Sequence, residues 1–542
     1  MKQLFLALTF FLLTAPAGLA QTPTWSWLRT VEGVNSVVDL AGSSTSQIYV
    51  TGLFDNRLQL GNRLLTSPGR CLYVARLNPN GQVTQTTQLN VSDDVLPTSL
   101  AVDRSGNCFV TGSFRGTLSY GRNSQLTSQS PDTDDVLLLK INPAGAVSWV
   151  QQVSGTAPDR NTVPSRGWSV AVDQGGNSFV TGSVSGTTVR FGNRSFSNRQ
   201  NKAFLASYSP QGTVRWAKVW DAPADTYAPS TGRATAVDGA GNCYVSGSFF
   251  STLTVDGTTL QPANSDSNLF LLRFDAAQGQ LRWALAPAGS GDGRSLGTDA
   301  AGKVYLADSF SGSTTFGATT LTSTGSADIF VTRYTRQGQV EWATALGGPN
   351  YDFPTDIAVD KAAGRAYLTG SQANGQAFIT QLQANGQVAR TTLVGGPGSS
   401  TGSSLVLDER NTVYTAGIAT GSCQFGPYTT NNPATACYLA RLDNADGRPS
   451  CQVSSPTALV TSVFPNPVQG RFTLRIQAPA ADQNWKATLL NPFGRIVAQQ
   501  TLRSTAGTTT DATFDTAGLP SGLYVLNLEH NQQVTTQLVT VR

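Results

Sequence analysis

Residues 238–249 read Asp-Gly-Ala-Gly-Asn-Cys-Tyr-Val-Ser-Gly-Ser-Phe, and an apolar Ala-Val pair stands before the aspartate. The first half has the composition of a tight turn, because Asp and Asn bond back to nearby backbone and Gly accepts a positive φ. The second half has the composition of a buried β-strand. The stretch therefore predicts two antiparallel strands joined by a short turn.

The end of the second strand recurs seven times along the chain, as Thr-Gly or a near match. The seven copies are Val50–Gly52, Val110–Gly112, Val180–Gly182, Val245–Gly247, Leu306–Asp308, Leu368–Gly370 and Thr415–Gly417. From Thr51 the steps between copies are 60, 70, 65, 61, 62 and 47 residues. Units of about sixty residues in series predict a radial or solenoid array.

Each unit has room for four strands, which we name A to D. In the second unit they are expected at residues 99–103, 108–113, 135–142 and 146–150. The A–B and C–D turns are short and uniform, whereas the B–C and D–A connections are long and differ between units. Strand D usually carries a tryptophan four residues after the turn glycine, at Trp149, Trp216, Trp283 and Trp342. We interpret these as packing between units and not as a cofactor site.

The seventh unit ends after its strand C, residues 437–443, and has no strand D. Trp27 is followed six residues later by Gly33, as Trp149 is by Gly155. The segment around residues 25–27 is therefore expected to supply the missing strand. Because such closure removes exposed sheet edges, we predict an all-β fold: a seven-bladed β-propeller with an N-terminal strand closing the last blade, in preference to an open β-helix.

The repeat resembles a known family. Asp238–Phe249 and Asp173–Ser183 are similar to the β-propeller repeats of bacterial exported proteins, whose units read roughly Asp-x-x-Gly-Asn-x-Tyr-Val-Thr-Gly-Ser-Phe. The resemblance covers residues 34–447 and implies the fold. It implies no activity, since the family is defined by its repeat.

The N-terminus has the pattern of a secretory signal over residues 1–20. Lys2 precedes an apolar run at residues 4–13. Gly18 and Ala20 supply the small side chains that a signal peptidase needs at positions −3 and −1. Six cysteines, an even count, are consistent with an oxidising compartment. Cys423 and Cys437 flank an expected hairpin and are the candidate disulfide.

The C-terminal residues have a different pattern. A linker rich in Ser, Pro and Thr, residues 450–457, separates the propeller (residues 21–449) from residues 458–542. Short alternating strands with regularly spaced turns predict a small immunoglobulin-like β-sandwich there.

Three motifs in this region resemble the type A C-terminal sorting domain of the type IX secretion system of Bacteroidetes. They are Pro465-Asn466-Pro467, the turn Gly494-Arg495, and the run 519–524 with Gly522 and Tyr524. The resemblance implies export by the outer-membrane type IX machinery, then removal of the domain with release or peripheral attachment at the cell surface. An ordinary immunoglobulin-like module is the alternative.

The composition excludes several kinds of chemistry. His530 is the single histidine, so Ser-His-Asp, Cys-His and HExxH sites are excluded. A net charge of +4 over 542 residues, without a basic run, argues against nucleic acid. We expect no cofactor and no metal. The recurring aspartates are interpreted as caps of their own turns, too poor in oxygen ligands for calcium: Asp103, Asp173, Asp238, Asp299, Asp360 and Asp408.

The variable loops are the candidate binding surface. In a four-stranded unit the B–C and D–A loops lie on one face, and loops on a rigid scaffold are where binding usually occurs. The candidate ligand residues are Arg160, Arg166, Trp168, Trp220, Asp225, Tyr227, Tyr351, Asp352 and Phe353. Aromatic faces beside Asp and Arg suit a polysaccharide or a protein; alternatively, they seal gaps between blades.

The leading hypothesis is a secreted or cell-surface, monomeric binding or adhesion protein without catalysis. A carbohydrate-active hydrolase or lyase that uses rim carboxylates is the second hypothesis. A purely structural envelope ring is the third.

Overall fold

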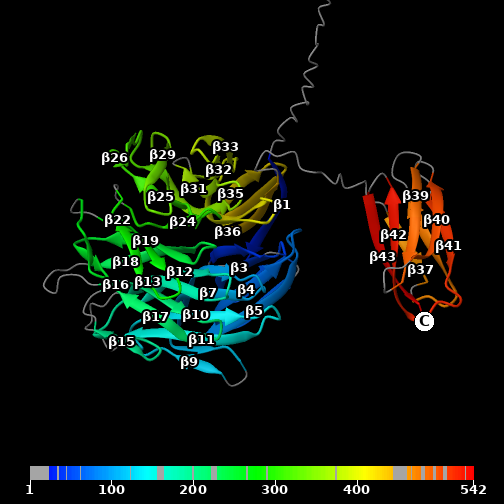
Figure 1. Cartoon of the computed structure of the whole chain (residues 1–542), viewed down its shortest axis with the longest axis horizontal. Helices are drawn as coiled ribbons and strands as arrows, with labels where there is room; N and C mark the ends of the chain where they lie inside the picture. The colour runs from blue at the N-terminus through cyan, green and yellow to red at the C-terminus, as the bar shows by residue number, and fades with distance from the viewer. Residues whose placement is uncertain are drawn as a thin grey trace, which may run out of the picture. The chain divides into compact units, whose positions relative to one another are not determined.

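The computed structural model describes residues 23–541 apart from these gaps: 33–35, 44, 62, 122–123, 156–163, 198–200, 221–228, 264–266, 288–290, 373–374, 444–459, 466, 478–482, 492–495, 505–508 and 531–532. All regular elements in the described residues are β-strands (Figure 1). No helix in this part of the chain is long and apolar enough to span a bilayer. The chain divides into two compact units, residues 20–448 and residues 449–542 with 1–19. The expected secretory signal and linker lie outside the described residues.

The first unit contains seven sets of four antiparallel strands, and the strands of each set follow the order A to D. The first set is β2 (Ser36–Gly42), β3 (Ile48–Leu60), β4 (Arg63–Leu77) and β5 (Val83–Val91). The second set is β6 (Asp94–Val102), β7 (Cys108–Arg115), β10 (Asp135–Ile141) and β11 (Val147–Gly155). The third set is β12 (Arg166–Val172), β13 (Ser178–Val184), β16 (Lys202–Tyr208) and β17 (Val214–Val219). The fourth and fifth are β18 (Ser230–Val237), β19 (Asn242–Phe249), β22 (Asn268–Asp275), β23 (Leu281–Leu285); and β24 (Ser295–Thr298), β25 (Val304–Phe310), β28 (Asp328–Tyr334), β29 (Val340–Leu346). The last two are β30 (Phe353–Asp360), β31 (Arg365–Gln372), β32 (Gln376–Leu382), β33 (Val388–Leu393); and β34 (Ser399–Leu407), β35 (Val413–Phe425), β36 (Tyr428–Asp443), β1 (Thr24–Glu32).

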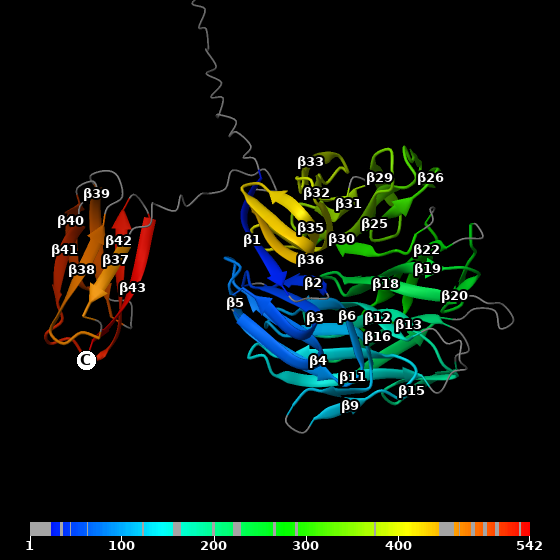
Figure 2. The ribbon, with the colours of Figure 1, turned by 180° about the vertical axis from the view of Figure 1, so that it is seen from behind.

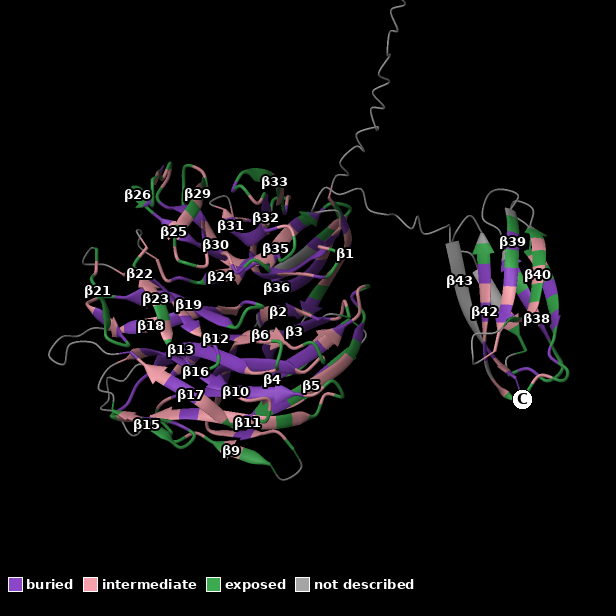
Figure 3. Ribbon diagram, in the orientation of Figure 1, coloured by how far each residue is buried: buried purple, intermediate pink, exposed green. Residues whose placement is uncertain are grey.

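Strands B and C form the core of every set. In the second set, β10 is buried along its whole length and β7 is buried except for its last residue. Both faces of these strands pack against neighbouring sets, which explains their nearly continuous apolar sequences. Strands D are more exposed, as Figure 3 shows for β11 and β33.

The A strands contact one another in series, from β2 through β6, β12, β18, β24 and β30 to β34, and β34 contacts β2. A side-chain oxygen on one A strand accepts a hydrogen bond from a backbone N–H on the next A strand at five of these joints. Asp39 accepts from Leu100, Ser99 from Val170, Ser169 from Thr235, Asp356 from Leu405 and Ser404 from Leu40, at 2.7–3.3 Å. The joint from the seventh set back to the first therefore has the same form as four of the six joints between consecutive sets.

The N-terminal strand pairs as expected with the last repeat. β1 is antiparallel to β36 from Thr24 opposite Asp443 to Val31 opposite Cys437 (Figure 2). The indole N–H of Trp27 donates to the Pro79 carbonyl at 2.9 Å, in the C–D turn of the first set. Trp149, Trp216, Trp283 and Trp342 each make the same bond to the C–D turn of the following set. These tryptophans therefore pack between sets, as the sequence predicts.

The B–C connections differ from the expected free loops. In four sets they contain a small hairpin: β8 (Thr117–Ser119) with β9 (Gln125–Thr127), β14 (Thr188–Phe191) with β15 (Arg194–Ser197), β20 (Leu253–Val255) with β21 (Thr258–Leu260), and β26 (Ser313–Phe316) with β27 (Thr319–Thr322). In the first and seventh sets, long B and C strands continue into an equivalent hairpin. β8 pairs with β5 and β14 with β11, so these hairpins cover the outer edge of the preceding set. Much of the B–C sequence is thus committed to edge protection.

The second unit has two sheets that share one buried core. The three-stranded sheet is β37 (Val460–Phe464), β38 (Arg471–Gln477) and β41 (Thr509–Asp515). The four-stranded sheet is β40 (Ile496–Ser504), β39 (Gln483–Leu490), β42 (Gly522–His530) and β43 (Gln533–Val541). Pro465 and Pro467 follow β37 and are exposed, and Gly522 begins β42. Asn466, Gly494 and Arg495 lie outside the described residues.

The predicted disulfide between Cys423 and Cys437 is absent. Both thiols are free and buried; Cys423 is opposite Thr430, and Cys437 is opposite Ile418. Five positions along β35 separate Ile418 from Cys423, which corresponds to roughly 16 Å in an extended strand. A disulfide needs Cα atoms within about 7 Å, so the two residues are too far apart. The sequence correctly places both cysteines on one hairpin but suggests the wrong register. Cys108 and Cys243 are buried free thiols.

Candidate functional site

Two of the predicted rim residues, Arg166 and Trp168, lie at the start of β12 and form a cluster with a residue of the next set. The guanidinium of Arg233, on β18, lies 4.2 Å from the centre of the Trp168 ring, and that of Arg166 lies 5.0 Å from it. Arg233 also pairs with Asp292 at 3.4 Å. Burial lowers the pKa of Arg233. The cluster joins the third, fourth and fifth sets, and both guanidinium groups are already in contact with Trp168.

Trp220 does not belong to the rim surface. It is 2 % exposed and packs edge to face on Phe270, with ring centres 4.9 Å apart, so it is a core residue between the third and fourth sets. Its position at the end of a strand explains the rim expectation, but its side chain turns inward. Arg160, Asp225 and Tyr227 lie outside the described residues.

The third predicted group lies beside a pocket between the fifth and sixth sets. The sixth set has no B–C hairpin, because Gln372 at the end of β31 and Gln376 at the start of β32 are paired with each other. The space that such a hairpin covers elsewhere is left open here. A cavity of about 280 Å³ lies there, between β28 and β29 on one side and β31, β32 and β33 on the other.

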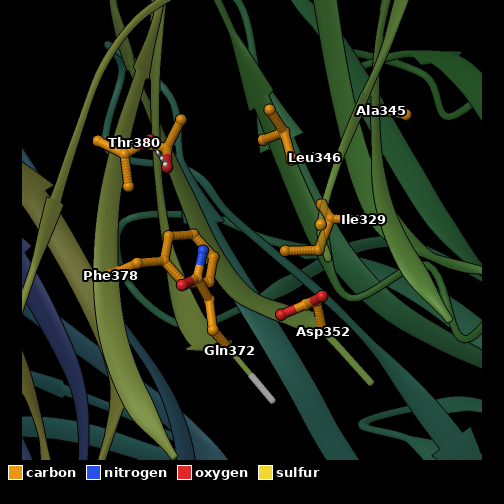
Figure 4. A pocket seen from close by; sticks show the side chains of 9 residues that line it. Ile329, Ala345, Leu346, Asp352, Gln372, Phe378 and Thr380 are labelled. Atoms are coloured by element: carbon orange, nitrogen blue, oxygen red, sulfur yellow. Dashed lines mark hydrogen bonds between the residues drawn. The ribbon is translucent and has the colours of Figure 1, made fainter. Parts of the chain in front are cut away.

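The pocket is lined by both apolar and polar side chains (Figure 4). Ile329, Leu346 and Phe378 supply apolar surface. Asp352, Gln372 and a pair of threonines supply the polar groups; Thr380 and Thr391 are hydrogen-bonded to each other at 3.0 Å. This mixture of apolar surface with a few convergent polar groups is typical of ligand pockets.

The predicted residues 351–353 have three different environments. Tyr351 is 54 % exposed, and its ring lies 5.8 Å from the ring of Phe353, at the start of β30. Asp352 is 2 % exposed and lines the pocket, where its carboxylate accepts a hydrogen bond from the Gly348 N–H at 2.8 Å. An exposed tyrosine and a half-buried phenylalanine thus flank a carboxylate that is held by its own loop.

The sequence pattern indicated Asp352 and missed the other lining residues. Ile329, Leu346, Gln372, Phe378, Thr380 and Thr391 belong to regular strands and have no special pattern. One signal was available: the step of 47 residues from Thr369 to Ala416 is the shortest in the series. The shortened repeat is the one that lacks the hairpin and carries the pocket.

The turn aspartates have the predicted structural role. In the second, third and fourth sets, one carboxylate oxygen accepts from two backbone N–H groups of the turn and the other accepts from the Asn side chain. Asp299, Asp360 and Asp408 likewise each accept two backbone bonds. Within the described part of the chain, no group of three His, Cys, Asp or Glu residues is arranged to hold a metal ion.

Several solved structures share a distant likeness with this chain. BamB from Moraxella catarrhalis is 13 % identical, with 77 % of this chain and 98 % of that chain covered and a TM-score of 0.31. A protein of unknown function from Dyadobacter fermentans is 9 % identical, with coverage of 65 % and 98 % and a TM-score of 0.37. A gluconolactonase from Xanthomonas campestris is 12 % identical, with coverage of 65 % and 96 % and a TM-score of 0.28. Likeness at this level says nothing of function, and no curated protein matches the chain.

The family comparison identifies the C-terminal unit. Residues 462–542 match the model of the secretion system C-terminal sorting domain. Within this region Tyr524 is 2 % exposed, and its side chain belongs to the core that the two sheets share. The chain therefore ends in a type IX sorting domain, which marks proteins that are exported to the cell surface or the extracellular space.

Proposed function

We propose that this protein is an exported, non-enzymatic, monomeric binding protein: a seven-bladed β-propeller that binds a polysaccharide outside the cell through its B–C and D–A loop face. The pocket between the fifth and sixth sets is the proposed centre of that surface. The observation that supports this proposal most directly is that the exposed Tyr351 stands beside the carboxylate of Asp352, which lines the pocket.

Three features support seven blades with β1 as the last outer strand. Seven four-stranded sets follow one another, the contacts between A strands return from β34 to β2, and β1 pairs with β36. β1 also pairs with the hairpin extension of β3, at Val31–Leu60, in the way that β5 pairs with β8. A closed array explains why the seventh joint has the same form as four of the other six.

An immunoglobulin-like sandwich is proposed for residues 458–542. The phenol of Tyr524 donates to the Pro520 carbonyl at 2.9 Å, four residues upstream, which is the contact of a tyrosine corner in such folds. We propose residues 1–20 as a cleaved secretory signal, residues 21–449 as the propeller and residues 450–457 as a linker cut after export by a Bacteroidetes-like type IX system. The propeller then acts at the cell surface or free in the medium.

The pocket suits a sugar chemically. Sugar rings present C–H faces that stack on exposed aromatic side chains, and their hydroxyl groups donate to carboxylate and amide oxygens. Tyr351 and Phe353 offer the aromatic surface, while Asp352 and Gln372 offer acceptors. The missing hairpin gives a chain-like ligand an open approach between two blades.

Affinity measurements with the full chain on a panel of plant and algal polysaccharides test the proposal. Tyr351→Ala is expected to weaken binding about tenfold, the equivalent of one aromatic contact. Phe464→Ala is the matched control, because Phe464 is 39 % exposed and belongs to the C-terminal unit and not to the proposed loop face. Equal binding by Tyr351→Ala and the natural chain, or no binding to any polysaccharide, would contradict the proposal. Binding to a surface protein and to no polysaccharide would be consistent with the proposed binding surface but would show that its ligand is a protein.

The same panel tests the hydrolase or lyase alternative. The natural chain is incubated with each polysaccharide, and new reducing ends are measured. If they form with the natural chain and are lost with Asp352→Asn, the protein is an enzyme and the binding proposal is wrong.

A further inference from the structure

The pocket between the fifth and sixth sets differs from the other gaps in the residue near the end of strand B. Two positions after the glycine of the Thr-Gly motif, or after the Asp308 that replaces it, the other six sets have a buried apolar residue. These residues are Phe54, Phe114, Val184, Phe249, Phe310 and Ala419. The sixth set has Gln372 at this position, and Gln372 lines the pocket (Figure 4). An amide therefore stands where the other sets have an apolar contact.

The residue of strand C opposite the motif is also less covered in this gap. In six sets this residue is aromatic: Tyr73, Phe204, Phe270, Phe330, Phe378 and Tyr438. A second aromatic ring lies against five of the six, with ring centres 4.7–6.2 Å apart. Among the described residues Phe378 has no such partner, and it lines the pocket. The space beside Phe378 is therefore open to an apolar group of a ligand.

The pocket has one charged side chain and several neutral polar ones. The charged group is the Asp352 carboxylate, and the described lining contains no lysine, arginine or histidine. The hydroxyl groups of Thr380 and Thr391 bond to each other at 3.0 Å. The Gln372 amide has N–H donors and a carbonyl acceptor. A negatively charged sugar would meet the Asp352 carboxylate without a compensating cation in the lining, so the pocket suits an uncharged group.

We propose that the pocket binds an N-acetylated amino sugar unit of the polysaccharide and holds its acetamido group. This inference rests on the proposed function and names the class of sugar. An acetamido group has one N–H donor, one carbonyl acceptor and a methyl group. The Gln372 amide donates to the carbonyl, the Asp352 carboxylate accepts from the N–H, and the methyl group lies against Phe378 and Ile329. Neither a hydroxyl group nor a free amine offers this combination.

The size of the cavity is consistent with one sugar unit. Its volume of about 280 Å³ is at the small end of the range for ligand pockets. The remainder of the polysaccharide chain then lies outside, beside Tyr351, which is exposed next to the pocket.

Calorimetric titration of the full chain with oligosaccharides of N-acetylglucosamine, glucosamine and glucose tests this assignment. The three probes have the same length and linkage, so they differ only in the acetamido, amino or hydroxyl group of each unit. The N-acetylglucosamine probe is expected to bind at least tenfold more tightly than the other two, because those leave a polar group of the pocket unpaired and lack the methyl contact.

Two substitutions of Gln372 test its role. Gln372→Glu keeps the size of the side chain but removes the donor, and it is expected to weaken binding of the N-acetylglucosamine probe about tenfold. Gln372→Phe introduces the residue that four other sets have at this position, and it is expected to fill the pocket and remove the preference for this probe. Gln211→Glu is the control, because Gln211 is an exposed glutamine in a C–D turn of the third set. Thermal unfolding without ligand checks that all three variants are folded.

Equal binding of the three probes by the natural chain would overturn the inference, as would a preference for N-acetylglucosamine that both Gln372 variants retain. In either case, weaker polysaccharide binding by Tyr351→Ala would still support the proposed function. Absence of binding to every oligosaccharide and polysaccharide would show that the proposed function itself is wrong.

Discussion

Asp173 shows why one residue type recurs in six of the seven repeats; in the first repeat the Ser43 hydroxyl accepts the equivalent backbone bonds. The Oδ1 atom of Asp173 accepts from the N–H groups of Gly175 and Asn177 at 2.8 and 2.9 Å, and its Oδ2 accepts from the Asn177 side chain at 2.8 Å. One carboxylate thus satisfies two turn N–H groups and fixes the residue that opens the next strand. In the fifth and seventh sets, Lys303 and Thr412 replace the Asn, and the two backbone bonds remain.

We predict that Asp173→Ala lowers the free energy of unfolding by about 2 kcal/mol, since it leaves turn N–H groups unpaired. Chemical denaturation of the full chain measures the change. Asp132→Ala is the control, because Asp132 is an exposed aspartate outside any A–B turn, and we expect it to have almost no effect. Equal effects of the two substitutions would show that the turn bonds contribute little.

The pairing of strands A and B explains the Thr-Gly motif at the scale of the element. In six sets the A strand has a bulge opposite the motif, as between Pro97 and Ser99. A Cβ on Gly112 would collide with the Leu96 carbonyl of that bulge. The fifth set has Asp308 where the other sets have glycine, and the described register of β24 and β25 contains no bulge. Glycine and bulge are therefore present together or absent together.

Gly112→Ala is predicted to destabilise the protein by about 3 kcal/mol, because the new methyl group overlaps backbone that cannot move without breaking the ladder. Gly69→Ala on β4 is the matched control. Gly69 has no neighbour within 4 Å of an added Cβ, so alanine there is expected to be neutral or slightly stabilising. Thermal unfolding of both variants distinguishes a steric requirement from a general preference; a stable Gly112→Ala protein would argue against the bulge.

At the scale of the whole molecule, the joint between the sixth, seventh and first sets carries a shared proton. The Ser404 hydroxyl lies 2.8 Å from both Asp39 Oδ1 and Asp356 Oδ2 and accepts from the Leu40 N–H. A serine has one hydrogen to donate, so one of the two carboxyl groups must itself be protonated to make both contacts. Burial, together with repulsion from Asp356, raises the pKa of Asp39 to about 7. Burial also raises the pKa of Asp356.

This raised pKa predicts a pH dependence of stability. Between pH 4 and pH 7, approximately, the folded protein holds a proton that the unfolded chain has lost. The free energy of unfolding should therefore fall as the pH rises through this range, because the unfolded state binds fewer protons there. Asp39→Asn removes one titrating group and keeps an acceptor for the Leu100 N–H. It is expected to flatten the slope and to be more stable than the natural chain at pH 8.

Denaturant unfolding at a series of pH values checks this prediction, with Asp132→Asn as the control for an exposed aspartate. An unchanged slope in Asp39→Asn would contradict the shared proton.

Features that depend on local periodicity and turn chemistry could be predicted from the amino-acid sequence. The repeats, the turn caps at Asp103, Asp173 and Asp238, the inter-set role of Trp149 and the pairing of residues 24–32 with the last repeat all follow from spacing and residue type. The sorting domain at residues 462–542 could likewise be identified from its short motifs in order. These features are specified within a few residues of one another or by a pattern that repeats.

What fills the space between the sets, in contrast, depends on the folded arrangement of the whole chain. Trp220 and Tyr351 are both aromatic residues near strand ends, yet the first is buried and the second is exposed, according to which neighbour covers each. The pocket at Asp352 lies where one hairpin is missing, and a cavity of about 500 Å³ beside the A–B turns gathers Arg104 and Lys361 from sequence positions more than two hundred residues apart. Such environments depend on packing between distant segments, and a repeat pattern carries no information about which neighbour is absent.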